Sequence, residues 1–192
     1  MHPEKQFILF TGHMIDKPER KQPRFPASKE QVARKAIEVE LKQVKKNGGN
    51  LFGIAGGACG GDILFHEIAA ELDIPTAIHL ALPKERFAEE SVIFVNKDWE
   101  KRFDDLCSRL PVHVLSEPPA FTGDSDELNI WERSNRWMLH HALQNGGKHM
   151  TLLALWNGEA GDGAGGTDHM AEIARNVGST VTIIDTRSVF EL

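Results

Sequence analysis

The chain has few cysteines, no long apolar run and no excess of positive charge. Its two cysteines, Cys59 and Cys107, are too few for a disulfide framework and show no metal-ligand spacing. No apolar stretch approaches the roughly 20 residues of a membrane-spanning helix. The N-terminal residues 1–6 carry no signal-peptide pattern. We therefore expect a cytoplasmic protein that does not bind a membrane. Cys59 lies in a glycine loop, where it is either a reactive thiol or a small filler residue.

The histidines show no ligand spacing that argues for a metal either, so we expect no metal site; those considered are His13, His66, His140 and His141. The formal net charge is −6, and no basic stripe is present that could neutralise phosphates along a strand. This argues against a general nucleic-acid binder, although a few arginines can still form a local anion site. The 192 residues are enough to bury a core, and we find no repeat, low-complexity tract or linker. We expect a single domain over residues 1–192.

Short apolar runs alternate with amphipathic segments along almost the whole chain. Strands are expected at 7–10, 51–55, 76–82, 112–115, 149–156 and 180–184. Helices are expected at 28–47, 62–72, 84–90, 97–110, 128–145 and 167–177. Ser28 and Gln31 form a capping-box pattern at the start of the first helix, and Gly48 and Gly49 end it. The alternation predicts a three-layer, Rossmann-like α/β fold with a mostly parallel sheet of five or six strands.

In open parallel sheets, ligands lie beyond the carboxyl ends of the strands. Three segments are expected there: Thr11, Gly12 and His13 after the first strand, the glycine loop 56–62, and the glycine loop 158–168. They are far apart in the sequence, but the fold would bring them to one edge of the sheet. We expect that edge to carry the ligand site.

The first glycine loop follows a strand and opens a helix, and its glycines would let a ligand approach backbone N–H groups; they are Gly56, Gly57, Gly60 and Gly61. The helix N-terminus suits an anion. Asp62 would repel a phosphate, so we assign it to ribose hydroxyls or to the N–H groups of its own loop. A plain helix cap is the alternative. The loop is neither a dinucleotide fingerprint nor a P-loop, since G-x-G-x-x-G and Gly-Lys-Ser/Thr are both missing.

The second glycine loop has five glycines between a strand and a helix, which is more backbone freedom than a simple connection needs. Gly165 and Gly166 are candidate ligand contacts, and Thr167 is placed to cap the helix that follows. A mobile turn without a ligand role is the alternative for this loop.

Further candidates come from a basic loop and from a late helix. Arg20 and Arg24 follow the first strand, where guanidinium groups would bind a phosphate or carboxylate unless the loop is simply solvated. Asn135 is a polar amide on an apolar helix side, so it needs hydrogen-bond partners from a ligand or from a loop backbone. Glu132 is one step round the same helix and could face the same cleft.

Several of these segments together resemble a Rossmann-like domain that is found fused to adenylate cyclases and tetratricopeptide-repeat proteins. The resemblance is carried by residues 11–16, 23–26 and 58–65, and it continues through Leu82-Pro83, Phe87, Ser91-Val92, Trp99, Arg102-Phe103, Asn135-Arg136, Trp156-Asn157-Gly158 and Gly165-Gly166-Thr167. More remotely, the chain is similar to the SLOG superfamily, which includes the Lonely Guy phosphoribohydrolases, DNA-processing Rossmann proteins and sensors of nucleotide signals. This resemblance implies a Rossmann-like fold and a nucleotide-type ligand.

The chain departs from the phosphoribohydrolases at their signature P-G-G-x-G-T-x-x-E. It has no glutamate three places after Thr167, and Glu172 comes five places after it. Two residues along a helix correspond to a rotation of roughly 200 degrees, so Glu172 would point away from a sugar bound by this loop. We therefore expect binding rather than turnover.

Three functions remain open. The first is a binding or sensor domain for a nucleotide or an ADP-ribose-like ligand, which would be its small-molecule partner. The second is an enzyme that cleaves the N-glycosidic bond of a nucleotide, with Glu132 and Asp62 as its catalytic carboxylates. The third is a scaffold with an inactive pocket, held together as a homo-oligomer.

Overall fold

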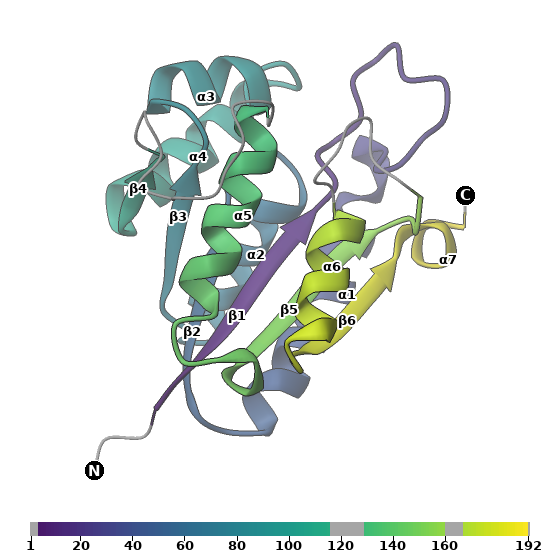
Figure 1. Cartoon of the computed structure of the whole chain (residues 1–192). Helices are drawn as coiled ribbons and strands as arrows, with labels where there is room; N and C mark the ends of the chain where they lie inside the picture. Colours follow the sequence, from purple (N-terminus) through teal and green to yellow (C-terminus); the bar gives the residue numbers. More distant parts are fainter. Residues whose placement is uncertain (1–3, 116–128, 160–166, 192) are drawn as a thin grey trace.

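The computed structural model describes residues 4–115, 129–159 and 167–191 (Figure 1). The strands are β1 (Lys5–Gly12), β2 (Asn50–Ala55), β3 (Thr76–Leu80), β4 (Val112–Val114), β5 (Met150–Trp156) and β6 (Thr180–Asp185). The helices of this described part are α1 (Glu30–Lys46), α2 (Gly61–Glu71), α3 (Lys84–Ser91), α4 (Lys97–Arg109), α5 (Ile130–Ala142), α6 (Thr167–Asn176) and α7 (Thr186–Phe190). Two short 3-10 helices cover Ala27–Lys29 and Gly147–His149. No helix of the described ranges is long and apolar enough to cross a membrane.

The six strands form one sheet in the order β4-β3-β2-β1-β5-β6, and every neighbouring pair is parallel. The expected Rossmann-like α/β fold is confirmed, and the sheet is wholly rather than mostly parallel. The chain moves outward from β1 to β4 and then returns to place β5 on the other side of β1. The strand order therefore reverses between β1 and β5, which is where such sheets open a crevice at their carboxyl edge.

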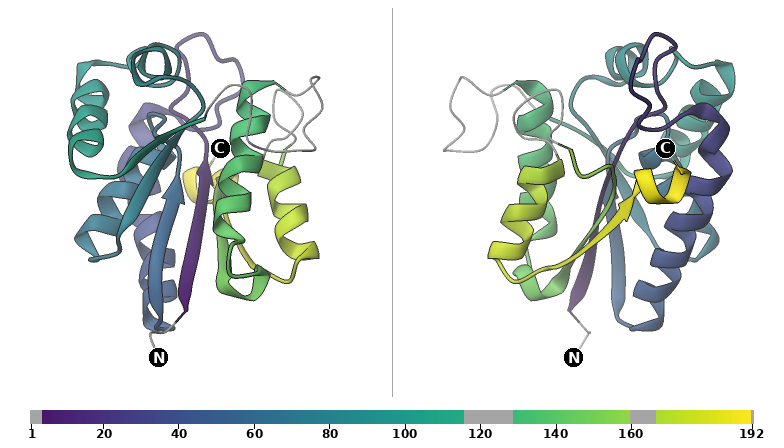
Figure 2. Two further views of the ribbon diagram at one scale, coloured as in Figure 1. Left: turned by 60° about the vertical axis from the view of Figure 1, so that its left-hand side comes forward. Right: turned by 90° about the vertical axis from the view of Figure 1, so that its right-hand side faces the viewer.

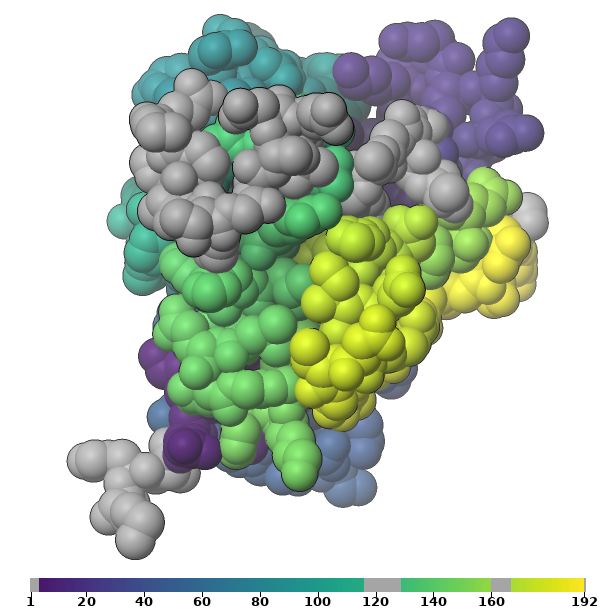
Figure 3. Space-filling view, in the orientation of Figure 1, coloured from purple at the N-terminus to yellow at the C-terminus, as the bar shows by residue number. Residues whose placement is uncertain are grey.

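Helices cover both faces of the sheet and make three layers (Figure 2). One face carries α1, α2, α4 and α7, which contact one another, while α5 and α6 lie together on the opposite face. Figure 3 shows α5 and α6 side by side on that face. The loop that follows β1 rises above the sheet at the top right of the same view.

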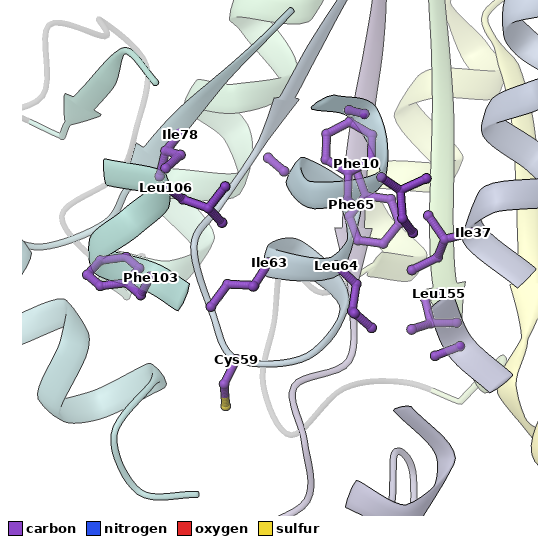
Figure 4. Packing of buried hydrophobic residues seen from close by; sticks show 14 of the residues in the cluster. Phe10, Ile37, Cys59, Ile63, Leu64, Phe65, Ile78, Phe103, Leu106 and Leu155 are labelled. Carbon is purple, nitrogen blue, oxygen red and sulfur yellow. The ribbon is translucent and has the colours of Figure 1, made fainter. Parts of the chain in front are cut away.

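The larger core lies under α1, α2 and α4. Phe10 of β1 stacks on Phe65 of α2, with ring centroids 4.8 Å apart and planes 13° apart (Figure 4). Ile37 from α1 and Phe103 from α4 belong to the same cluster, and both are fully or almost fully buried. Burial of a side chain of this size contributes roughly 1.5–3 kcal/mol. The core therefore holds the beginning of α2, and with it the first glycine loop, against β1.

The start of the first helix differs from the capping box expected at Ser28 and Gln31. Pro26 precedes a 3-10 turn over Ala27–Lys29, and α1 begins only at Glu30. Ser28 therefore lies inside the 3-10 turn, and the residue that caps α1 is Lys29, which makes no side-chain cap bond. The end of this helix is as expected, since Gly48 has a φ of +79°.

Other boundaries differ as well. The first strand runs over Lys5–Gly12 rather than over residues 7–10, so Thr11 and Gly12 lie within it. The third strand ends at Leu80 rather than at residue 82, and the described α5 is shorter than the expected helix at 128–145. The short C-terminal helix α7 was not expected; the Asp185 side chain begins it by accepting a hydrogen bond from the N–H of Arg187.

Candidate functional site

A cavity of about 380 Å³ lies at the carboxyl edge of the sheet, between the first glycine loop, α3 and α5. Its lining combines apolar side chains with a few charged and polar ones: Met14, Lys17, Gly56, Ala58, Asp62, His79, Ala81, Phe87, Glu90, Ser91, Trp131, Ser134, Asn135 and Met138. Such a mixture of apolar walls and a few polar groups is typical of small-molecule sites. The cavity therefore lies where the strand-helix alternation predicted a ligand.

The glycines of the first loop are required by close contacts with the rest of the chain. A Cβ on Gly60, whose φ is +108°, would lie 2.8 Å from the Ile15 nitrogen. A Cβ on Gly57 would lie 2.8 Å from the Phe103 ring, and one on Gly56 would lie 2.5 Å from Oδ2 of Asp62. Protein atoms already occupy the space that these missing side chains would fill. The glycine pattern is therefore explained without a ligand.

Several N–H groups of this loop are also used inside the protein. The N–H of Ala58 donates to Asp62 Oδ2 at 3.2 Å, and the N–H of Cys59 donates to the Ser91 carbonyl at 2.9 Å. The N–H of Gly61 donates to the His13 carbonyl at 3.1 Å. An anion at the start of α2 would have to compete with these bonds. These N–H groups of the loop therefore bond to other parts of the chain, and the open space is the cavity beside the loop.

Asp62 is the carboxyl group at the centre of this arrangement. It lies in the first turn of α2, lines the cavity and accepts the bond from Ala58. Burial raises the pKa of Asp62 to about 7, and the backbone bond offsets only part of that rise. The expected bond to its own loop is thus present. At neutral pH the group exists in both protonation states, so it can accept or donate a hydrogen bond to a polar group in the cavity.

The helix α5 supplies the opposite wall. Asn129 begins it by accepting hydrogen bonds from the N–H groups of Trp131 and Glu132. Ser134, Asn135 and Met138 line the cavity, so the amide that sequence analysis selected is at the site.

Glu132 is placed differently from the expectation that it could face the cleft. It is 6% exposed, outside the residues that line the cavity, and its carboxylate lies 3.4 Å from the guanidinium of Arg136. The helix turn carries Ser134 and Asn135 to the cavity and leaves Glu132 on another side. It therefore does not share a cavity with Asp62 in this structure.

An aromatic wall closes the cavity from α3 and α5. The rings of Phe87 and Trp131 meet edge to face, with centroids 5.9 Å apart. In the sequence, Phe87 and Ser91 were named only as part of a resemblance, and His79 and Glu90 were not selected. No spacing signal links these residues to Asp62, because the contact between Cys59 and Ser91 that brings α3 over the loop is not local in the sequence.

A second hollow, of about 240 Å³, lies beside the cavity and shares Met14 and Lys17 with it. It is lined by the segment that follows β1, including Gly12, His13, Asp16, Arg20 and Arg24. We refer to it as the basic hollow.

Asp16 organises the basic hollow. Its carboxylate accepts hydrogen bonds from the N–H groups of Arg24 and Phe25, at 3.0 and 2.9 Å, and lies 3.4 Å from Nε of Arg20. One carboxylate thus contacts the side chain of Arg20 and holds the backbone of Arg24. The hollow holds more basic than acidic side chains, because Lys17, Arg20 and Arg24 surround that single carboxylate.

The crevice between β1 and β5 is closed by direct contacts. The hydroxyls of Thr11 and Thr167 are 3.4 Å apart, which links the end of β1 to the start of α6. Nε2 of His13 lies 3.1 Å from both the backbone nitrogen and the side-chain Oδ1 of Asn157, so it bonds to one or the other according to its tautomer. Burial lowers the pKa of His13, which favours the neutral ring.

Of the second glycine loop, Gly165 and Gly166 lie outside the described residues, whereas Thr167 is the first residue of α6. Over the described ranges, no group of three or more His, Cys, Asp or Glu side chains is arranged to hold a metal ion.

No family model matches the chain. No curated protein matches it either. Among solved structures, the chain is similar to DNA processing protein A (DprA) from Streptococcus pneumoniae, with 14% sequence identity and a TM-score of 0.41. The match covers 100% of this chain and 62% of that one, so this chain spans less than two thirds of the length of that protein. A likeness at this level says nothing about what the chain binds.

Proposed function

We propose that the chain binds a nucleotide or a nucleotide-derived small molecule of the ADP-ribose type, as a binding or sensor domain of SLOG type. The observation that carries this proposal is the junction of two unlike spaces at the carboxyl edge of the sheet. The cavity has apolar and aromatic walls with a few polar groups, and the basic hollow beside it has arginine and lysine side chains. A nucleotide has the same two halves, a flat base with its sugar and an anionic phosphate.

Each half of the ligand has a matching set of residues. The base would lie against Phe87, Trp131 and Met138, because aromatic and thioether side chains contact π-systems favourably. Asp62 and Asn135 would bind ribose hydroxyls or the polar edge of the base. Lys17 borders both spaces, so it would lie close to the first phosphate.

The arginines of the basic hollow would bind the phosphates. A guanidinium–phosphate hydrogen bond contributes roughly 1.5–3 kcal/mol. We expect changing both Arg20 and Arg24 to alanine to weaken binding of a phosphorylated ligand at least tenfold. The matched control is the change of Arg109 and Arg175 to alanine, since these arginines lie near the ends of α4 and α6, away from the hollow.

The test is a thermal-stabilisation screen with adenosine, AMP, ADP-ribose and NAD, followed by calorimetric titration. A ligand at 100 times its dissociation constant stabilises the folded state by roughly 2.7 kcal/mol. The proposal predicts that AMP or ADP-ribose stabilises the protein, and that the double arginine variant loses this effect. Equal affinity of that variant and the wild type for every phosphorylated compound would place the arginines outside the site.

Hydrolysis of an N-glycosidic bond is the second candidate, and the pKa of Asp62 favours it. A carboxyl group with a pKa of about 7 is suited to general acid or base catalysis near neutral pH. Glu90 is the other carboxylate of the cavity lining and replaces Glu132 as the partner to test. Incubation with AMP, NAD and ADP-ribose, followed by chromatography, would detect released base. Release that Asp62→Asn abolishes, while binding persists, would establish turnover and displace the sensor proposal.

A further inference from the structure

A pair of histidines joins α5 to the sheet beside the cavity. His79 lies on β3 and is 2% exposed, while His141 lies in the last turn of α5. Nε2 of His79 and Nδ1 of His141 are 2.8 Å apart, which is a hydrogen bond between two imidazole rings. Trp137 packs against both rings, with centroids 4.6 and 5.4 Å away.

A hydrogen bond between two imidazole nitrogens limits how many protons the two rings can carry. One of the two facing nitrogens carries a hydrogen and the other must present its lone pair. The other ring nitrogen of His79, Nδ1, is buried and has no hydrogen-bond partner among the described residues. A proton placed on that nitrogen would create a buried donor with nothing to accept it, which costs about 1–3 kcal/mol. The packed arrangement therefore favours a neutral pair.

The groups that act on the pair electrostatically within the described ranges are further imidazoles. They are His113 on β4, His66 on α2 and His140 on α5. The ring of His113 lies 4.9 Å from that of His79. Asp62, at the start of α2, lines the same cavity as His79 and loses its proton only near neutral pH. A positive charge on the pair would thus be buried beside other rings that can themselves become positive.

We propose that this histidine pair makes ligand binding in the cavity depend on pH, because protonation separates α5 from β3 and the cavity needs both. The inference rests on the proposed function, since it concerns regulation of the same site. His79 lines the cavity directly, and so do Ser134, Asn135 and Met138 on α5. Met138 is one turn before His141. A shift of α5 away from His79 therefore moves one wall of the cavity.

The direction of the effect follows from linkage. Burial lowers the pKa of both His79 and His141 in the packed state. When the pKa of a group is lower in one conformation than in another, a falling pH favours the other conformation, because the group binds its proton more readily there. Acid therefore favours the arrangement in which the rings are solvated and α5 is detached. A ligand that contacts both β3 and α5 binds the packed arrangement, so its affinity falls with pH.

The test combines hydrogen exchange with binding of ADP-ribose, at pH 7.5 and 5.0 and with a chelator present. ADP-ribose suits this comparison because it lacks a terminal phosphate that would titrate near pH 6. The variant is His141→Gln, whose amide oxygen still accepts a hydrogen bond from Nε2–H of His79 but whose side chain cannot be protonated in this range. The control is His140→Gln, which removes an exposed histidine from the same helix. Asp62 titrates in all three proteins alike.

For the wild type and His140→Gln, we expect acidification to raise exchange in α5 relative to α6 and to weaken ADP-ribose binding at least tenfold. For His141→Gln we expect less than threefold weakening and steady exchange in α5. The proposal would be overturned if acidification raised hydrogen exchange equally in α5 and α6. It would also be overturned if acidification raised exchange in α5 of His141→Gln as much as in the wild type. Affinity that does not change with pH in the wild type would overturn it and leave the binding function standing. Failure of ADP-ribose to bind at either pH would count against the proposed function, and the exchange data alone would then decide whether the pair acts as a switch.

Discussion

At the scale of single residues, burial of Asp62 in the cavity wall disfavours the charged form of its carboxyl group. Its carboxyl lines the cavity, accepts one backbone hydrogen bond and has a pKa raised to about 7 by burial. Carboxyl groups with strongly shifted pKa values in a cavity are candidates for contact with a ligand. The free-energy cost of burying the charged carboxylate appears as a pH dependence of the free energy of unfolding.

We expect Asp62→Asn to stabilise the protein at pH 8 more than at pH 5. The unfolded carboxyl ionises near pH 4 and the folded one near pH 7, so the folded state holds an extra proton between these values. Stability of the wild type therefore falls as the pH rises through this window, and asparagine removes that loss. Urea unfolding at both pH values should show the gain from the substitution growing by about 2 kcal/mol or more. Asp73→Asn, at a carboxyl whose side chain is 95% exposed, should show no such growth.

Gly60 illustrates a second kind of residue constraint, because its backbone angle and its neighbours both exclude a side chain. We expect Gly60→Ala to destabilise the protein by at least about 2 kcal/mol more than Gly48→Ala. Both glycines have a positive φ, of +108° and +79°, but a Cβ on Gly48 would meet nothing within 4 Å. Their difference measures the contact with the segment after β1 together with the less tolerated backbone angle of Gly60. Equal losses in chemical denaturation would show that this contact is not tight.

At the scale of elements, the side chain of Arg102 joins three helices on one face of the sheet, α1, α2 and α4, and α2 carries Asp62 of the cavity. Arg102 of α4 donates two hydrogen bonds to Glu67 of α2, at 2.7 and 2.8 Å, and a third to Glu30 of α1 at 2.8 Å. Its guanidinium also lies 3.9 Å from the centroid of the Trp99 ring. Lysine has neither the planar fork nor the stacking surface.

We therefore expect Arg102→Lys to destabilise the protein by about 1–2 kcal/mol. The matched control is Arg109→Lys, because the Arg109 side chain donates only to a carbonyl of its own helix, that of Asp105, in the described contacts. A change in the urea midpoint of Arg102→Lys no larger than that of the control would mean that the three helices are held by their apolar contacts alone.

At the scale of the whole molecule, the order of elements was predictable because periodicity is a local property of the chain. The alternation of apolar runs and amphipathic segments predicted the parallel sheet and placed Thr11 and Asp62 at its carboxyl edge, whereas Asn135 was selected as a polar residue on an apolar helix side. The predicted element boundaries were wrong where the local signal was ambiguous. Ser28, for example, was expected to begin the first helix but lies in a 3-10 turn after Pro26.

The composition of the site could be predicted only in part. The same glycine spacing serves a bound phosphate or a neighbouring strand, and the structure shows that Gly57 and Gly60 face protein atoms. Similarly, helical periodicity placed Glu132 near the cleft, but two residues further on the helix presents Ser134 instead. His79 was not selected, because its partner His141 is 62 positions away in the sequence.

The central claim is that a nucleotide-type ligand occupies the cavity, and the methionines of the chain can report on it. Met14 and Met138 line the cavity, while Met150 and Met170 do not; Met138, Met150 and Met170 also belong to the smaller hydrophobic core under α5 and α6. The most direct measurement is an NMR titration of methyl-labelled methionine with AMP and ADP-ribose. The account predicts saturable shifts of the Met14 and Met138 methyl signals with little change at Met150 and Met170. Saturation confined to Met150 and Met170, or no saturable shift with either compound, would contradict it.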